Sequence, residues 1–215
     1  RRPGLRRLGL FYFLNYAGLG AFFPFLPLLL AGRGLSATQV AWVMLSIPVF
    51  NLLMPPLWGG LADAWRARLA LLRLASLGAA LAVLLMLVVH GFAGHLLAVV
   101  LFSFFRSPIH TLADAATSAA LGDDQRRFGQ VRVWGSAGFG LFVQVMGLWR
   151  AATRPAILVG TTAVSYGLSV LATWGLAAPP VGREPGLWRQ LRTEVQAPAL
   201  RLFLLANTVY YAAHA

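Results

Sequence analysis

The sequence has little charge, no lysine and no cysteine. Only 11% of its 215 residues are charged, whereas about a quarter are charged in a typical soluble domain. With 59% hydrophobic residues and a mean hydropathy of +0.71, a soluble fold would leave large apolar areas in water. The absence of cysteine excludes disulfides, thiol nucleophiles and thiolate metal ligands. The composition therefore favours a membrane protein over a hydrophobic soluble helical bundle.

The basic residues lie in short clusters separated by long uncharged stretches. All 18 are arginine, and the formal net charge is +12. A nucleic-acid-binding domain would gather such residues on one basic face. Scattered clusters between apolar runs are instead typical of a membrane protein whose orientation is set by its basic loops. We therefore expect no nucleic-acid partner.

Apolar runs predict membrane-spanning helices, because a helix needs about 20 apolar residues to cross the hydrocarbon core. Six complete spans are predicted: Leu8–Leu30, Thr38–Ala62, Leu69–Val89, His95–Leu121, Phe128–Trp149 and Pro155–Ala177. We predict an all-α polytopic membrane protein with a six-helix bundle over residues 1–177. A polar, proline-containing linker follows over 178–200, and residues 201–215 begin a seventh span. We expect the chain to be part of a longer protein.

The distribution of arginine predicts the orientation. With the N-terminus inside, only Arg33, Arg150 and Arg154 fall on the outer side, and Arg106 and Arg132 lie within spans. All other arginines fall on the side of the N-terminus. Because cytoplasmic loops are enriched in basic residues, we predict a cytoplasmic N-terminus and a cytoplasmic linker.

The fourth predicted span carries three ionisable residues four positions apart, Arg106, His110 and Asp114. At about 100° per residue their directions differ by only about 80°, so they share one helix face. A charge inside the membrane costs roughly 3 kcal/mol unless it is paired or hydrated, so this face predicts a bundle interior or a water-filled cavity. Arg132 lies one turn into the fifth span, at a depth similar to that of Asp114. The two side chains can therefore pair across helices.

Two interpretations of these charges stay open. A pair of Asp114 and Arg132 can simply fix the helix register. Alternatively, Asp114, Arg132, Arg106 and His110 together bind a substrate and a proton.

Uncharged polar residues in the first span, Asn15 and Tyr16, are further candidates for this substrate and proton site. A mid-span asparagine often only bonds a neighbouring helix, however. His90 and His95 give no metal-ligand spacing. We therefore predict no metal, no cofactor and no catalytic residue.

The loop after the second span reads Gly59-Gly60-Leu61-Ala62-Asp63-Ala64-Trp65-Arg66-Ala67-Arg68. It resembles the major facilitator signature Gly-x-x-x-Asp-x-x-Gly-x-Arg. Gly59, Asp63 and Arg68 are in register, and Arg66 stands at the second glycine. Six spans, a linker and the start of a seventh are also similar to the N-terminal half of that twelve-helix fold.

Two more stretches resemble the branch of lactose permease and, more closely, the phenylpropionate permease group. They are Gly20-Ala21-Phe22-Phe23-Pro24-Phe25, and Ser107-Pro108 with Leu112-Ala113-Asp114 and Phe128-Gly129-Gln130-Val131-Arg132-Val133-Trp134-Gly135-Ser136. The resemblance implies that Asp114 and Arg132 bind substrate. It also implies that Gly59, Asp63 and Arg68 belong to a cytoplasmic gate against a missing C-terminal half.

We therefore expect a secondary transporter of the bacterial inner (plasma) membrane that works by alternating access. Its expected partners are the lipid bilayer, a small-molecule substrate and protons. The paired arginines favour symport of an organic anion such as an aromatic acid, with a sugar or nucleoside next. A drug–proton antiporter of the same fold is an alternative. An intramembrane enzyme would need a nucleophile–base or metal constellation at one depth, and no zinc or protease motif accompanies the charged face. A non-catalytic membrane scaffold would not need buried charges.

Cysteine labelling tests the predicted topology, because the chain has no cysteine of its own. Single cysteines introduced at Arg66, Arg126 and Gly91 each report one side of the membrane. We predict that an impermeant maleimide labels positions 66 and 126 only from the cytoplasm, and position 91 only from outside. Labelling of positions 91 and 126 from the same side would contradict both the helix count and the orientation.

Overall fold

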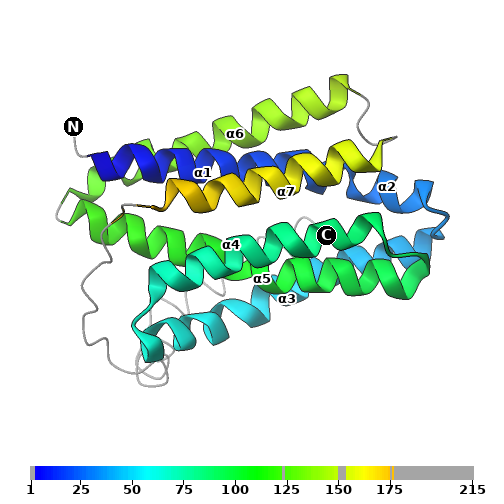
Figure 1. Ribbon diagram of the computed structural model, residues 1–215, viewed down its shortest axis with the longest axis horizontal. Helices are drawn as coiled ribbons and strands as arrows, with labels where there is room; N and C mark the ends of the chain where they lie inside the picture. The colour runs from blue at the N-terminus through cyan, green and yellow to red at the C-terminus, as the bar shows by residue number, and fades with distance from the viewer. Residues whose placement is uncertain (1–2, 123, 150–153, 175, 177–215) are drawn as a thin grey trace, which may run out of the picture. The chain divides into compact units, whose positions relative to one another are not determined.

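The computed structural model describes residues 3–122, 124–149, 154–174 and 176, and every element there is a helix (Figure 1). The chain divides into two compact units, Arg1–Pro180 and Val181–Ala215, and the described residues all belong to the first. The predicted linker over 178–200 and the seventh span over 201–215 lie outside the described residues.

Six helical spans are long and apolar enough to cross a membrane, which confirms the prediction of a polytopic all-α protein. The elements are α1 (Pro3–Phe22), the 3-10 turn η1 (Phe23–Phe25), α2 (Leu26–Gly32), α3 (Ala37–Trp65), α4 (Arg68–Leu84), η2 (Leu85–Leu87), α5 (Gly91–Leu121), η3 (Gln125–Arg127), α6 (Phe128–Leu148) and α7 (Pro155–Ala172). The first span is divided because Pro24 falls in η1, and a proline has no N–H for the helical ladder.

The ends of two spans differ from the sequence-based expectation. The span predicted to begin at His95 starts four residues earlier, because α5 already begins at Gly91. Gly91 has a φ of +67°, a left-handed conformation that glycine adopts without steric cost, and it turns the chain directly into the helix. At the other end of the bundle, α7 stops at Ala172. Thr173 caps it, and its hydroxyl and carbonyl oxygens accept bonds from Arg73 of α4 at 2.9 and 3.0 Å.

The helices form two groups that α4 and α7 join (Figure 1). In one group α1 packs on α6 and α7, and in the other α5 packs on α3 and α4. Only 11% of the span in α3 and 22% of that in α6 is buried, compared with 50% or more in the other four. Thus α3 and α6 are edge helices, and α1 and α5 lie between them.

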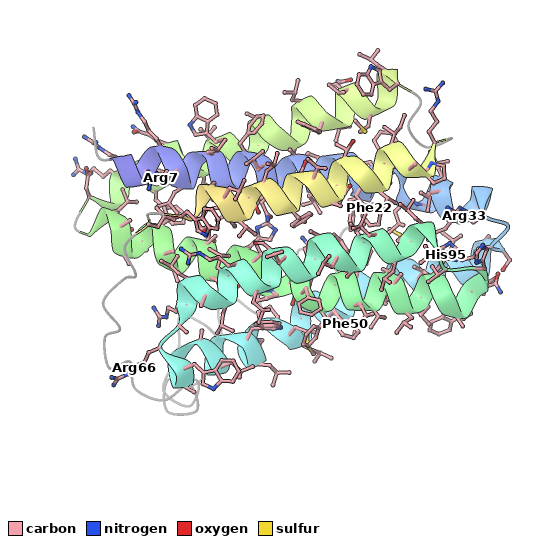
Figure 2. All side chains as sticks on the ribbon, viewed as in Figure 1. Arg7, Phe22, Arg33, Phe50, Arg66 and His95 are labelled. Atoms are coloured by element: carbon pink, nitrogen blue, oxygen red, sulfur yellow. The ribbon has the colours of Figure 1, made fainter. Side chains whose placement is uncertain are left out.

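The two ends of the bundle carry different labelled side chains in Figure 2. Arg7 and Arg66 lie at one end, and Arg33 and His95 lie at the other. This separation of the two pairs is expected, because successive spans cross the bundle in opposite directions. Which end faces the cytoplasm stays a prediction from the arginine bias.

Glycines bring α1 and α6 into close contact. A methyl group on Gly138 would overlap the backbone carbonyl of Phe13, and one on Gly135 would lie 2.8 Å from the ring of Tyr16. Small residues let membrane helices approach at backbone distance, where van der Waals packing holds them together. This approach determines where α6 presents Arg132, one turn before Gly135.

Substitution of Gly138 tests this packing. We predict that Gly138→Ala lowers the free energy of unfolding in detergent by about 1–3 kcal/mol, because the new methyl group meets backbone that cannot rotate away. The matched control is Gly140→Ala on the same helix, where the described residues leave the added methyl group without a neighbour within 4 Å. Equal melting temperatures for the two variants would contradict close packing of α1 on α6.

Candidate functional site

A buried arginine of α5 joins three helices. Arg106 is 6% exposed, and its Nη2 donates a hydrogen bond of 2.8 Å to Oδ1 of Asn51 on α3. Its Nη1 lies 3.3 Å from Nε2 of His110, one turn further along α5. The Nε atom is buried and has no hydrogen-bond partner within the described part of the chain. The hydroxyl of Tyr166, on α7, lies close to the guanidinium.

One turn beyond His110, Asp114 is held by two other helices. The hydroxyl of Tyr12 on α1 donates a bond of 2.5 Å to Oδ1. Nη1 of Arg132 on α6 lies 3.4 Å from Oδ2. The side chain of Asp114 is 31% exposed and that of Arg132 is 48% exposed. The expected ion pair therefore forms, and both of its side chains are partly exposed.

Tyr16 closes the space between these two groups of contacts. Its ring centroid lies 4.8 Å from that of His110 and 6.5 Å from that of Tyr12. The same ring covers Gly135 of α6. Together the side chains form a continuous polar stripe that crosses the bundle from α3 over α5 and α1 to α6. We call it the polar stripe and define it by its members: Tyr12, Tyr16, Asn51, Arg106, His110, Asp114 and Arg132.

The stripe is suited to reversible binding of a polar solute. Its arginines donate hydrogen bonds, its carboxylate accepts them, and the imidazole of His110 can do either. Charges inside membrane-spanning helices are tolerated where they face the bundle interior or a water-filled cavity. Exposure increases along the stripe, from buried Arg106 on α5 to half-exposed Arg132 on α6.

Most of the predicted site residues belong to this stripe. Arg106, His110, Asp114 and Arg132 do so together with Tyr16, whereas Asn15 does not. Its side chain is 1% exposed, and neither its amide oxygen nor its nitrogen has a hydrogen-bond partner among the residues described. Asn15 points away from Tyr16 because neighbouring positions on a helix face directions about 100° apart.

Tyr12 belongs to the stripe but was not among the site residues predicted from the sequence. The helical period contains the signal that would have found it. Tyr12 precedes Tyr16 by four residues, and residues four apart on a helix lie on the same face. The hydroxyl of a buried tyrosine usually requires a partner, and the only carboxylate within a candidate span is that of Asp114.

The expected gate residues lie where α3 ends and α4 begins. Gly59 is in the last two turns of α3, Arg68 begins α4, and the side chain of Asp63 lies outside the described part. Arg66 ends α3 in the left-handed conformation, with a φ of +51°. This is the position of the second glycine in the signature. The turn therefore keeps the geometry that glycine favours, at the steric cost of an arginine.

Residues 5–183 of the chain match the MFS_1 like family. The chain belongs to this family of major facilitator transporters. Over 206 residues it is 31% identical to the maltose permease of Geobacillus stearothermophilus. The aligned region covers 94% of this chain and 52% of the permease. Over 138 residues it is 28% identical to the uncharacterized transporter YwbF of Bacillus subtilis (strain 168), covering 64% of this chain and 35% of that protein.

Among solved structures, the fold is similar to that of the nucleoside transporter NupG. The TM-score is 0.81 at 20% sequence identity, over 98% of this chain and 53% of NupG. A second structure, of a NupG mutant, gives a TM-score of 0.80 over 97% of this chain and 51% of that one. The chain spans about half the length of maltose permease and of NupG.

These comparisons confirm two predictions. The chain corresponds to the N-terminal half of a major facilitator transporter, and it is a multi-pass membrane protein. The relatives with a named function are transporters, in agreement with the prediction that this chain is not an enzyme. The branch around the phenylpropionate permease group stays a prediction.

A double-mutant cycle tests the bond between Tyr12 and Asp114. We predict that Tyr12→Phe lowers the free energy of unfolding in detergent by about 1 kcal/mol, because Asp114 loses a charge-assisted hydrogen bond. The loss should shrink when Asp114→Asn is already present, since the bond to a neutral amide is weaker. Chemical unfolding of the four proteins measures this coupling. Strictly additive effects would show that the hydroxyl does not stabilise the carboxylate.

Proposed function

We propose that the chain provides half of a secondary transporter that binds a small polar solute at the polar stripe and couples its movement to protons. The observation that carries this proposal is the connected set of charges inside membrane-length helices. Such charges are expensive in a membrane unless they serve a polar pathway. Transporters of this kind bind substrate near the midplane between two helix bundles and expose it to each side in turn.

The ion pair has the properties of a reversible substrate contact. The distance of 3.4 Å between Arg132 and Asp114 exceeds the 2.7–2.9 Å that is typical of a short charge-assisted bond. A solute can therefore replace Asp114 as the hydrogen-bond partner of Arg132 at a small cost in free energy. The carboxylate of Asp114 would stay in place, because Tyr12 holds its other oxygen. Asp114 and His110 are the residues of the stripe that can exchange a proton.

Charge favours an organic acid as the substrate, because the stripe contains two arginines and one carboxylate. The relatives support a second candidate, since one is named a maltose permease and a similar fold is named a nucleoside transporter. A sugar or nucleoside would use the same donors and acceptors for its hydroxyl groups. The proposed location is the bacterial plasma membrane, with the N-terminus in the cytoplasm.

The proposed gate is the junction of α3 and α4, to which Gly59 and Asp63 of α3 and Arg68 of α4 belong. It lies at the end of the bundle that carries Arg66 and Arg7 (Figure 2). A gate there would act against the other half of the transporter and would not touch the solute.

Simultaneous removal of both charges separates a binding role from a structural one. Uptake of labelled maltose, uridine and benzoate is measured with the full-length protein in vesicles. Asp114→Asn and Arg132→Gln each leave one charge unpaired, whereas the double variant leaves none. We predict that the double variant recovers the stability lost in each single variant but stays inactive.

The matched control is Arg126→Gln, in the exposed turn η3. It should transport like the wild type, with uptake normalised to folded protein in the membrane. Near-normal uptake by the double variant would remove Asp114 and Arg132 from the site and leave the pair a structural role.

A further inference from the structure

The charge of Arg106 has no counterion in the described residues. Asp114 pairs with Arg132 and Asp124 pairs with Arg127, so neither of these carboxylates serves Arg106. The sequence contains only six acidic residues, and Asp114 is the only one inside a candidate span. A buried guanidinium without a carboxylate is costly. It is therefore a strong binding group for an anion that enters the stripe.

The hydrogen bond between Arg106 and His110 defines the protonation of the histidine. A guanidinium only donates, so Nε2 of His110 must accept the bond of 3.3 Å. The imidazole is then neutral and carries its proton on Nδ1. If Nε2 also took up a proton, it could no longer accept, and two cations would face each other in a buried position. An anion between them would remove this repulsion.

The other groups around His110 supply no such negative charge. From α1, Tyr16 covers its ring and Tyr12 bonds Asp114. From α3, the neutral Asn51 bonds Arg106. From α4, Arg73 is engaged with Thr173, and α6 contributes the cation Arg132. On α5 itself, Asp114 is already engaged by Tyr12 and Arg132, and Tyr166 of α7 is neutral.

We propose that Arg106, Asn51 and His110 form a carboxylate-binding subsite in which the anion and a proton bind together. The carboxylate takes the place of Nε2 of His110 as an acceptor for Arg106, and water delivers a proton to that Nε2. Each binding event then favours the other, since coupling between two sites is reciprocal. On the far side of the membrane the carboxylate leaves and the proton returns to water. The proposal rests on the transport function proposed above and names its substrate class.

The stoichiometry follows from the charges. A monocarboxylate and a proton together are neutral, so the loaded subsite has the same charge as the empty one. The empty and loaded forms then move the same charge in opposite directions, so no net charge crosses the membrane potential in a full transport cycle. Uptake should be electroneutral, with a pH gradient as its driving force.

Ligand-induced proton uptake tests the subsite directly. The purified full-length protein is mixed with benzoate in weakly buffered solution that contains a pH indicator. Because binding and protonation are linked, the wild type should take up about one proton per bound benzoate. The neutral analogue benzamide should cause no proton uptake. His110→Gln keeps an acceptor for Arg106 but cannot titrate, so it should take up no proton with benzoate. In a pH gradient its vesicles should accumulate no more benzoate than protein-free vesicles, which benzoic acid enters by passive diffusion.

A second variant, Asn51→Asp, provides Arg106 with a carboxylate of its own at the same position. It should fold at least as well as the wild type and should bind benzoate about tenfold or more weakly, the effect of losing a charged hydrogen-bond partner. The matched control is His90→Gln, at the exposed start of α5, which should behave like the wild type. Melting curves establish that each variant is folded.

Two results would overturn the subsite. One is proton uptake with benzoate that persists in His110→Gln, and the other is unchanged benzoate affinity in Asn51→Asp. Wild-type uptake of maltose or uridine without benzoate binding would also overturn it and would leave the proposed transport function intact. Absence of transport for all three solutes would instead refute the proposed function itself.

Discussion

The cost of an ionic group inside the membrane is the constraint on which this structure depends. Helices α1, α3, α5 and α6 are apolar around most of their surface, yet the polar stripe that they share contains three charged side chains, Arg106, Asp114 and Arg132. These side chains are tolerated because they meet each other, a tyrosine hydroxyl and an amide on one stripe. The arrangement of the helices follows from this need, since each of the four contributes a partner that another requires.

Close helix packing brings the charged side chains of the stripe within contact distance. The glycines of α6 let its backbone approach α1, so Arg132 reaches across to α5. The two least buried spans, in α3 and α6, contribute Asn51 and Arg132 to the two ends of the stripe. A bulky interface at α1 and α6 would move Arg132 away from Asp114 and would leave both charges unpaired. The small residues therefore contribute to the electrostatics of the site as well as to close packing.

Much of this could be predicted from the sequence, and the limits have physical causes. Run length identified six spans, and the four-residue spacing placed Arg106, His110 and Asp114 on one face. The pairing of Asp114 with Arg132 followed from equal depth. Periodicity within one helix cannot show which neighbour it faces, however. The bond from Tyr12 and the burial of Asn15 depend on the packing of α1 against α5 and α7, which no local pattern encodes.

The graded burial of the two arginines has a consequence for how a charged solute would travel. Arg132 is half exposed and Arg106 is almost fully buried, so the local dielectric constant falls along the stripe. Coulomb attraction grows as the dielectric constant falls. A solute anion would first meet a weak, screened attraction at Arg132. It would then meet a stronger attraction at Arg106, as its own hydration is lost. The stripe would thus work as an electrostatic ramp, along which attraction increases while water is removed.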